Sequence, residues 1–411
     1  MTRTLLYPFG HKPPADSSTP LRQRPPFDIS LTGFIYACML LFMVTAALTT
    51  EANLLYAVGG LMVGVLFVSY LICRMVTNRL RITRELPEHA VVGRTATFIY
   101  HFHNDKRFWP SLSVSLAEID GVEGFTRQPQ SYLLHAAARA RASVPVEVVP
   151  KRRGLQTLDH HQLCTSFPFG FIKLAVMHSH QDTMLVLPAI ATIDPRLLAL
   201  CLPAEKTGPT MRPRRGGVDE FYGLKEHRRG ENPRWIYWRR SARTGVLVSK
   251  EMTQVAPPRL LLMVDTYLSS PTRAEHARVE RVIAMAASLA SAALEQGLSV
   301  GLHIWMNGWN GLPATRGKRQ RRELMSMLAR LPANFKQDAK SLLASCQTAH
   351  QPGTTIVLLT GQNLELSLPD QLRGGVLVVS AEGPHADWFK FDSAVDFSTC
   401  IPLQEEAALT D

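Results

Sequence analysis

Two long apolar stretches open the hydrophobic pattern of the chain. Residues 29–50 and 52–73 each run for 22 residues without a charged side chain, and roughly 20 apolar residues cross the hydrocarbon core of a bilayer as a helix. A cleaved signal peptide is the alternative for the first stretch, because "TAALTTEA" could serve as a cleavage site. The apolar region of a signal peptide is only about 7–15 residues long, however, and here a second stretch follows almost at once. The pattern therefore predicts a two-helix membrane anchor at residues 29–74.

The charges that flank these stretches predict their orientation. Only Glu51 lies between them. Basic residues lie outside them, at Arg3, Lys12, Arg22, Arg24, Arg74, Arg79, Arg81 and Arg84. Because positively charged flanks remain in the cytoplasm, residues 1–28 are predicted to be a cytoplasmic N-terminal segment, and both termini and the soluble body are expected on that side. The spacing of Gly59, Gly60 and Gly64 would allow the two helices to approach closely, although glycine is also common in such helices.

Residues 80–190 have the pattern of short strands. In "TATFIYHFHN", apolar and polar residues alternate, which places Phe98, Tyr100 and Phe102 on one face together with Ala96. The runs "SLSVSLAEI" and "ASVPVEVV" alternate as well, and turn signals such as Val92-Gly93 separate the runs. Several short strands at this spacing predict a β-sandwich-like domain.

Residues 256–411 change to apolar strands that alternate with helices. The runs "RLLLMVDTY", "LSVGLHIWM", "TTIVLLTG" and "GGVLVVSAE" have the length of buried strands, and "RAEHARVERVIAMAASLASAALEQG" and "RGKRQRRELMSMLARLP" have helical periodicity. This alternation predicts a parallel sheet with helices on both faces. The fold class expected is α+β and multidomain.

Between these domains, residues 191–255 contain the unusual stretch "ENPRWIYWRRSAR" at 231–243. Asn232 is a good N-cap, Pro233 is a good first helical residue, and Gly245 can end the helix. We expect a three-turn helix at 233–244. Trp235, Trp238 and Ala242 share one stripe of that helix, which we expect to pack inward.

The arginines of this stretch allow two interpretations. Arg234 and Arg243 could pair with acidic residues of the same segment, namely Glu220, Glu226 or Glu231. Alternatively, the arginines form a surface for phosphate or for an acidic partner, and beside aromatic rings they could also bind single-stranded nucleic acid. For Arg228, Arg229, Arg239 and Arg240 we expect exposure. The net charge of +11 favours anionic partners in general.

Metal and catalytic chemistry find little support in the sequence. The six cysteines are scattered and form no C-x-x-C pair, which suits a reducing compartment. Three histidine doublets, His101/His103, His160/His161 and His178/His180, could bind a metal ion, or they are solvent-facing strand positions. Cys164 lies near His160 and His161 but in no recognised nucleophile motif, and there is no P-loop. We therefore expect no metal, no cofactor and no enzyme activity.

The stretch "LLLMVDTYLSS" resembles the first strand and loop of von Willebrand factor A domains. In that family the strand ends in D-x-S-x-S, which holds a divalent ion. Here the corresponding residues are Asp265, Tyr267 and Ser269, so a phenol replaces the first hydroxyl. In "LLTGQN", Gly361 stands where the family has a further aspartate. The resemblance implies an A-like domain at 256–411 with a parallel sheet and a degenerate, metal-free site, because Mg²⁺ prefers octahedral oxygen coordination.

Residues 217–251 resemble the signature of the bacterial "domain of unknown function 58" family. The matching residues are Glu220, Phe221, Leu224, Gly230, Arg234, Ile236, Trp238, Ser241, Ala242 and Arg243. Lys225 replaces an arginine, His227 a tyrosine and Glu231 an aspartate. The segment "KRRGLQTLDHHQLCTSFPFGFIK" is similar to the family's "RRG…DPFG" stretch, with Phe167 in place of its aspartate.

Members of this family are typically membrane-anchored and often encoded beside MoxR-type AAA+ ATPases. The resemblance implies a non-enzymatic scaffold or adaptor at the bacterial inner membrane that works with such an ATPase, with no specific nucleic acid and no small-molecule substrate. Binding of nucleic acid or anionic lipid is the first alternative, and an uncharacterised hydrolase or transferase is the second. The residues expected to bind the partner or to define the signature are Glu220, Phe221, Lys225, Arg228, Arg229, Gly230, Arg234, Trp238, Arg239, Arg240, Ser241 and Arg243.

Overall fold

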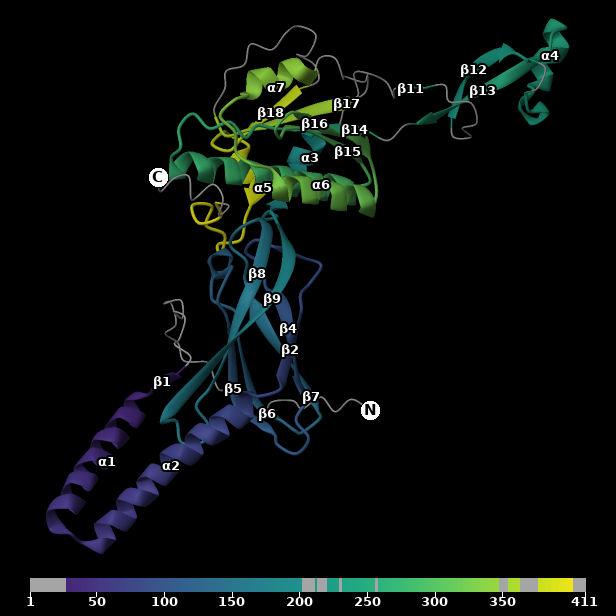
Figure 1. The fold of residues 1–411 in the computed structure, drawn as a ribbon. Coiled ribbons are helices and arrows are strands. Elements are labelled where there is room, and N and C mark those ends of the chain that lie inside the picture. The colour runs from purple at the N-terminus through teal and green to yellow at the C-terminus, as the bar shows by residue number, and fades with distance from the viewer. Residues whose placement is uncertain are drawn as a thin grey trace. The chain divides into compact units, whose positions relative to one another are not determined.

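The computed structural model describes residues 27–201, 211–212, 220–228, 231–255, 258–346, 354–362 and 376–401. The predicted cytoplasmic segment 1–28 lies almost entirely outside the described residues. The chain divides into two compact units, the first ending at Leu187 and the second beginning at Pro188. Figure 1 shows the elements of both, and each unit is described by itself.

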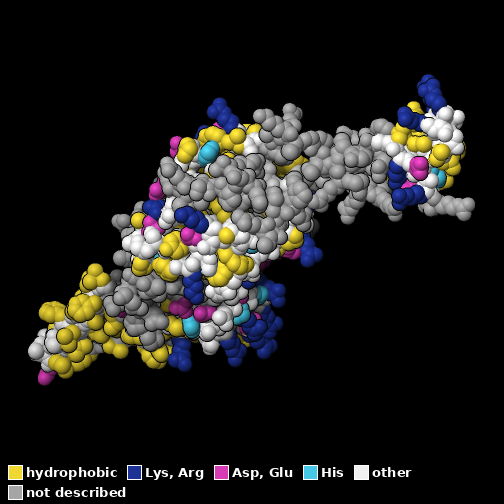
Figure 2. All heavy atoms as spheres, turned by 90° about the horizontal axis from the view of Figure 1, so that it is seen from above, with side chains coloured by type: hydrophobic (Ala, Val, Ile, Leu, Met, Phe, Trp, Pro, Cys, Tyr) yellow, Lys and Arg dark blue, Asp and Glu magenta, His cyan; other side chains and the backbone are white. Residues whose placement is uncertain are grey.

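The first unit begins with two apolar helices. α1 (Leu31–Thr50) and α2 (Asn53–Thr77) are long and apolar enough to cross a membrane, so the prediction of two such helices is confirmed. They form a hairpin in which the Tyr36 hydroxyl donates to the Met62 carbonyl at 3.1 Å. Hydrophobic side chains cover most of the hairpin surface that is visible in Figure 2, as expected for helices whose solvent is lipid.

The glycines of α2 do not mark a close approach of the two helices. A Cβ added at Gly59, Gly60 or Gly64 would meet no atom within 4 Å, so that interpretation is wrong. The close approach is at Gly33 in the first turn of α1, where a Cβ would collide with the Phe171 carbonyl oxygen. Glycine is needed there because the helix starts directly against the chain that leads into β9.

Two sheets complete the first unit. One has the order β1 (Phe27–Ile29), β9 (Ile172–Leu187), β8 (Gly154–Thr165), β5 (Ser111–Glu118) and β6 (Gln130–Ala136), with β3 (His89–Val91) beside β9. The other has the order β2 (Leu80–Glu85), β4 (Ala96–Asn104) and β7 (Arg141–Val148). A 3₁₀ turn, η1, spans Val122–Gly124. Phe98, Tyr100 and Phe102 are fully buried between the sheets, which confirms the face that the alternation predicted.

The C-terminal end of α2 is fixed to these sheets by a buried lysine. The Lys106 ammonium donates to the Val76 carbonyl at 2.6 Å and to the Ser111 hydroxyl at 2.7 Å. Lys106 is 8% exposed, and burial lowers its pKa to about 8. A cation at this position satisfies a free carbonyl and complements the helix dipole. The helical hairpin and the two sheets are therefore tied together at the end of α2.

The second unit contains a sheet with a parallel core. Its order is β16 (Trp309–Thr315), β15 (Ser299–Trp305), β14 (Arg259–Val264), β17 (Thr354–Thr360) and β18 (Val376–Ser380). β14 is parallel to both of its neighbours, and β17 is parallel to β18. β16 is antiparallel to β15, so the sheet that was expected to be parallel has an antiparallel strand at this edge. Asn307 and Gly308, with φ of 56° and 152°, form the tight turn that returns the chain beside β15.

Helices cover this sheet. Met263, Ile356 and Leu358 pack against α7 (Ala339–Cys346). α5 (Arg273–Glu295) contacts the central strands and α6 (Lys318–Arg330), and Figure 1 shows both across the sheet from α7. The unit also contains β10 (Thr192–Ile193), α3 (Pro195–Cys201), η3 (Ala386–Trp388) and β19 (Phe389–Lys390). β10 and β19 pair with each other.

The signature segment forms a small antiparallel sheet with one short helix. Its elements are β11 (Met211–Arg212), β12 (Glu220–Glu226), η2 (Pro233–Trp235), α4 (Trp238–Thr244) and β13 (Val248–Val255). Asn232 and Gly245 cap the two helical pieces as predicted. The continuous helix at 233–244 is wrong, because Ile236 bridges to Ser249 and the Tyr237 N–H donates to the Val248 carbonyl at 2.8 Å. These contacts with β13 require extended backbone in the middle of the expected helix.

Candidate functional site

Asp265 lies at the carboxyl end of β14, the central strand of the second sheet. The strands that follow β14 in the chain, β15 and β16, lie on one side of it, and β17 and β18 lie on the other. The strand order therefore changes direction between β14 and β17. In open α/β sheets, the carboxyl ends of the strands at such a switch point form the usual ligand site.

Each oxygen of the Asp265 carboxylate accepts a hydrogen bond from a neighbour. Its Oδ1 accepts from the Tyr267 N–H at 3.0 Å and its Oδ2 accepts from the Thr360 hydroxyl at 2.8 Å. Asp265 is 7% exposed, and burial raises its pKa to about 6. The adjacent loop is held by Asn334, whose side-chain amide donates to the Thr266 hydroxyl at 2.9 Å.

The residues around Asp265 do not fit a divalent ion. Tyr267 places a phenol where a short hydroxyl would be required, and Ser269 is exposed. At Gly361, a Cβ would lie 2.8 Å from Cδ of Arg278, so an arginine occupies the space that a further acidic ligand would need. Among the residues that the structure describes, no cluster of three histidine, cysteine or acidic side chains has the geometry to hold a metal ion.

We expect millimolar Mg²⁺ or Mn²⁺ to leave the unfolding temperature of the purified full-length chain unchanged. A bound ion would stabilise the folded state by mass action, but each oxygen of the Asp265 carboxylate already accepts a hydrogen bond, and Tyr267 and Gly361 stand where further oxygen ligands would be needed. Thermal unfolding with and without the ion, using Asp265→Ala as the control, measures this. An increase that the D265A variant abolishes would contradict a metal-free site.

The second candidate site is an exposed surface on α4. Trp238 is 64% exposed, and Arg239, Arg240 and Arg243 are exposed on the same helix. Val246 and Leu247, which follow the helix, are also about half exposed, at 50% and 47%. The predicted inward stripe is therefore wrong: Trp238 and Ala242 face solvent and Trp235 is half-buried. We name Trp238, Arg239, Arg240, Arg243, Val246 and Leu247 the α4 surface.

Ser241 and Ile236 face inward instead of the tryptophans. The Ser241 hydroxyl donates to the Tyr237 carbonyl at 3.1 Å and accepts from the Val248 N–H at 2.9 Å. It is 7% exposed, and Ile236 is 9% exposed. Ser241 thereby attaches α4 to the start of β13, and the tryptophan and arginines of α4 remain in solvent.

The acidic residue Glu231 of this segment pairs with Lys225 and not with the expected arginines. Glu231 pairs with Lys225 at 3.0 Å and lies 3.8 Å from Nδ1 of His227. Arg234 and Arg243 are exposed, and neither forms an ion pair with a described side chain, so their pairing with Glu226 or Glu231 is wrong. The alternative pairing with Glu220 stays a prediction, because the structure does not describe the Glu220 side chain.

The remaining signature residues divide into two groups. Arg228, Arg239 and Arg240 are exposed as expected. Arg229 and Gly230 lie outside the described residues, and Glu220 and Phe221 lie on β12 with side chains that the structure does not describe. The structure thus brings Lys225, His227 and Glu231 together and leaves the arginines of α4 available to solvent.

Residues 224–382 match the family model described as protein of unknown function DUF58. The chain is similar to this family over these residues, which are less than half of its length, and the match supports the resemblance of the signature at residues 217–251. No curated protein matches the chain.

The DUF58 segment contains both candidate sites. It begins within β12, includes α4 and Asp265, and ends directly after β18. The two apolar helices and the two sheets of the first unit lie outside it. A functional site that is shared with this family would therefore lie in the second unit.

Outside the DUF58 segment, the first unit buries a charged network that the sequence pattern did not reveal. The Arg84 guanidinium donates to Glu118 and to Asp182, each at 2.8 Å, and also to the Leu158 carbonyl at 2.8 Å. The Tyr100 hydroxyl donates to Glu118 at 2.9 Å. The side chains of Arg84 and Glu118 are 1% and 0% exposed. The one signal for this network was that Arg84 is in phase with the inward-facing Leu80 and Ile82.

One histidine of the three doublets is also buried here. His161 is 2% exposed, and neither of its ring nitrogens has a hydrogen-bond partner; its ring stacks on His178 with centroids 5.7 Å apart. The solvent-facing interpretation is wrong for His161, because β8 shifts its register between Leu158 and His160. One extra residue reverses which side chains face inward.

The same register separates Cys164 from both histidines. His161 points to the opposite face of β8, and His160 is four residues away along the strand, which is about 13 Å. His160 is instead bonded to Asp120 at 2.5 Å. The strand register therefore gives no support to His160 or His161 as a base for Cys164 in a nucleophilic mechanism.

Proposed function

We propose that the chain is a non-enzymatic adaptor that is anchored in the bacterial inner membrane and docks a MoxR-type AAA+ ATPase through the α4 surface. In this proposal α1 and α2 cross the membrane, and both termini and the soluble body are cytoplasmic. The chain holds the ATPase at the membrane, where the ATPase assembles or matures other proteins. The partner class is the one that the family resemblance implies.

The observation that carries the proposal is the exposure of Trp238 among three arginines. An exposed indole costs hydration free energy unless a partner covers it, and tryptophan and arginine are the side chains most enriched among binding hot spots. Val246 and Leu247 extend the apolar part of the surface. The occupant that fits is a pocket for an indole ring with carboxylates at its rim.

The proposed membrane anchoring rests on the charges that flank the two apolar helices and on the residues at the end of α2. The apolar run of α2 extends to Cys73, and Arg74 follows in the last turn. Basic residues follow α2, and Glu51 alone carries charge between the helices, which is the asymmetry of a cytoplasmic body.

We also propose that residues 256–411 are a degenerate von Willebrand factor A-like domain without a resident metal. The position of β14 in the middle of the sheet, with Asp265 at its carboxyl end, supports this proposal. The engaged Asp265 carboxylate and the Arg278 side chain beside Gly361 support the loss of the ion. Such a domain contributes binding surface without chemistry.

We expect Trp238→Ala to weaken ATPase binding about 30-fold, since a central aromatic hot spot contributes roughly 2 kcal/mol or more. Charge reversal in Arg239→Glu/Arg240→Glu/Arg243→Glu is expected to abolish binding. The measurement is retention of a MoxR-type ATPase by the detergent-purified full-length chain with ATP, ADP or no nucleotide.

The matched control reverses three exposed bases elsewhere in the second unit, Arg196→Glu/Arg316→Glu/Lys318→Glu, and should bind as the unmodified chain does. The proposal fails if no nucleotide condition retains the ATPase, or if both α4 variants bind normally. Labelling of a Trp238→Cys variant by an impermeant reagent on intact cells would overturn the cytoplasmic orientation.

A further inference from the structure

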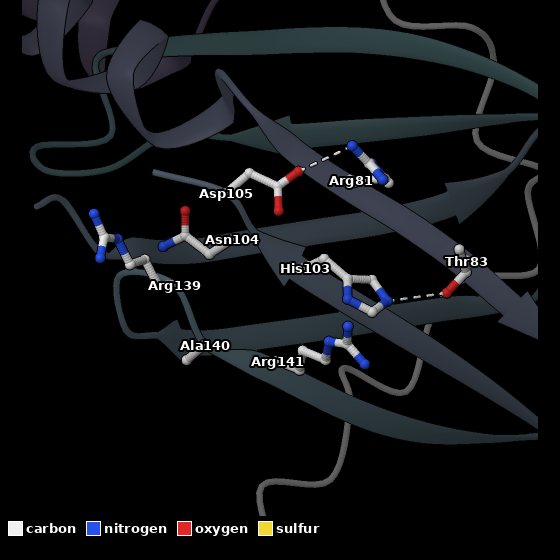
Figure 3. Close-up of a pocket in the computed structure, with 8 residues that line it drawn as sticks. All are labelled: Arg81, Thr83, His103, Asn104, Asp105, Arg139, Ala140 and Arg141. Carbon is white, nitrogen blue, oxygen red and sulfur yellow. Dashed lines mark hydrogen bonds and ion pairs between the residues drawn. The ribbon is translucent and has the colours of Figure 1, made fainter. Parts of the chain in front are cut away.

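A pocket in the first unit is lined mainly by basic side chains. The strand register of the β2–β4–β7 sheet places Arg81 opposite His103, and His103 opposite Arg141. Arg139 joins them from the turn before β7, with Asp105 as the one carboxylate in the lining. Figure 3 shows these side chains. The pocket that they line has a volume of about 440 Å³. Three guanidinium groups against one carboxylate favour an anionic ligand.

The guanidinium groups of the pocket are available to bind a ligand. Arg81 pairs with Asp105 at 3.3 Å, but their side chains are 74% and 50% exposed, and such a surface pair is weak and easily exchanged. Arg139 and Arg141 form no ion pair with any described side chain. Guanidinium groups bind phosphate with two parallel hydrogen bonds, so phosphate is the anion that this lining suits best.

The floor of the pocket is rigid and is connected to the end of α2. Asn104, 1% exposed, donates to the carbonyls of Ala136, Ala137 and Trp109 at 3.0–3.1 Å. The next turn carries Lys106, which binds the Val76 carbonyl in the last turn of α2. The pocket is therefore held at a fixed position beside the end of the second apolar helix.

The loop between the pocket and α2 displays aromatic rings to solvent. Phe108 is 76% exposed and Trp109 is 56% exposed, and the Arg107 guanidinium lies 5.1 Å from the Phe108 ring centroid. Aromatic and basic side chains in this combination are typical of the membrane–water interface. Phe108 and Trp109 are exposed in the structure, and lipid headgroups would cover both rings at that interface. This accounts for a loop that buries its lysine and exposes its aromatic side chains.

We propose that this pocket binds the phosphate group of an anionic phospholipid headgroup. The inference rests on the proposed membrane anchoring by α1 and α2, which brings the end of α2 to headgroup depth. The lipid then fixes the orientation of the first unit against the bilayer: its phosphate engages Arg139 and Arg141, and Phe108 and Trp109 insert between neighbouring headgroups. Free phosphate shares the same chemistry and is distinguished by the experiment.

The test uses the full-length chain in neutral detergent and measures retention of phosphatidic acid against phosphatidylcholine by native mass spectrometry. We expect preferential retention of phosphatidic acid, and about a 30-fold weaker affinity for it in Arg139→Gln/Arg141→Gln, since each base near an anionic surface contributes roughly a fivefold step. The matched control, Arg127→Gln/Arg196→Gln, removes two exposed charges elsewhere and should retain the lipid.

A second arm separates the lipid from free phosphate. Phe108→Ser/Trp109→Ser should weaken lipid retention, and inorganic phosphate at millimolar concentration should not displace the lipid. Equal retention of both lipids, equal retention by the R139Q/R141Q variant, or complete displacement by inorganic phosphate would each overturn the proposal. Extraction of membranes with alkaline carbonate tests the anchoring separately. Release of the chain by carbonate would refute the membrane anchoring. Loss of lipid selectivity in a chain that resists extraction would refute only the lipid site.

Discussion

Arg84→Met is expected to destabilise the first unit by about 3–5 kcal/mol, the usual cost of removing one partner from a buried ion pair. The variant leaves the Glu118 carboxylate, 0% exposed, without its cation. It also removes the donor to the Leu158 carbonyl. Hydrogen exchange of the full-length chain, followed by mass spectrometry, measures the loss in peptides from β4, β5 and β8 and leaves the second unit as an internal reference.

A second substitution separates the charge from the packing. In Arg84→Met/Glu118→Gln, the carboxylate becomes neutral and Tyr100 can still donate to it, so most of the lost stability should return. Arg127→Met, at an exposed position, is the matched control and should change stability by less than about 0.5 kcal/mol. Equal protection of β5 in R84M and in the unmodified chain would show that Arg84 does not compensate Glu118.

This network shows what the hydrophobic pattern can and cannot predict. The charge pattern places Arg84 among the exposed bases that flank α2, whereas in the structure its side chain is buried. Its phase with Leu80 and Ile82 was visible in the sequence. Its partners, however, come from β5 and β9, at positions 34 and 98 residues away, and no local pattern relates such distant acids to one base.

The apolar helices and the buried face of β4 were predictable because each follows from a local period. The 22-residue apolar runs need no partner to be recognised, and Phe98, Tyr100 and Phe102 alternate strictly. The interrupted helix at Tyr237 was not predictable for the opposite reason. The local capping signals at Asn232 and Gly245 are both used, but backbone pairing with β13 overrides helix propensity between them.

For both candidate sites of the DUF58 segment, the sequence showed the residue types but not their contacts in the folded chain. The missing acidic residue at Gly361 could be seen in the sequence, and so could the phenol at Tyr267. That the Arg278 side chain fills the space beside Gly361 could not be seen, since α5 and β17 meet only in the folded unit. On α4, the identities of the arginines were informative, but the direction of Trp238 depended on the bond from Ser241 to β13.

The pocket beside α2 could not be predicted from the sequence for a related reason. Arg81, His103 and Arg141 are far apart in the chain, and only the register of three antiparallel strands places them in one row. The sequence places Arg81 among the bases that flank α2, which agrees with the proposed role at the headgroups. Arg139 and Arg141 carried no signal beyond the overall positive charge.

Acidification is expected to destabilise the first unit through His161. Burial, followed by the positive charges of Arg84, His178, His180 and His160, lowers the pKa of His161 from 6.5 to about 3. The unfolded chain binds a proton at this residue below about pH 6.5, whereas the folded chain remains neutral there until about pH 3. The stability that a neutral His161 provides is therefore complete above pH 6.5 and decreases as the pH falls, by about 2–3 kcal/mol at pH 4.5.

The measurement must separate His161 from Glu118, which has the opposite sign. Burial raises the pKa of Glu118 to about 7, so its contribution to stability increases as the pH falls from 7 to 4.5. The difference between the unmodified chain and His161→Phe isolates the histidine, because phenylalanine fills a similar volume and leaves no ring nitrogen unpaired in the core. We expect H161F to equal or exceed the unmodified chain at pH 7 and to be increasingly more stable toward pH 4.5, by hydrogen exchange of β8 and β9 peptides. His135→Phe, at an exposed position on β6, should show no such divergence, and parallel pH profiles for H161F and the unmodified chain would mean that His161 is charged in the folded state.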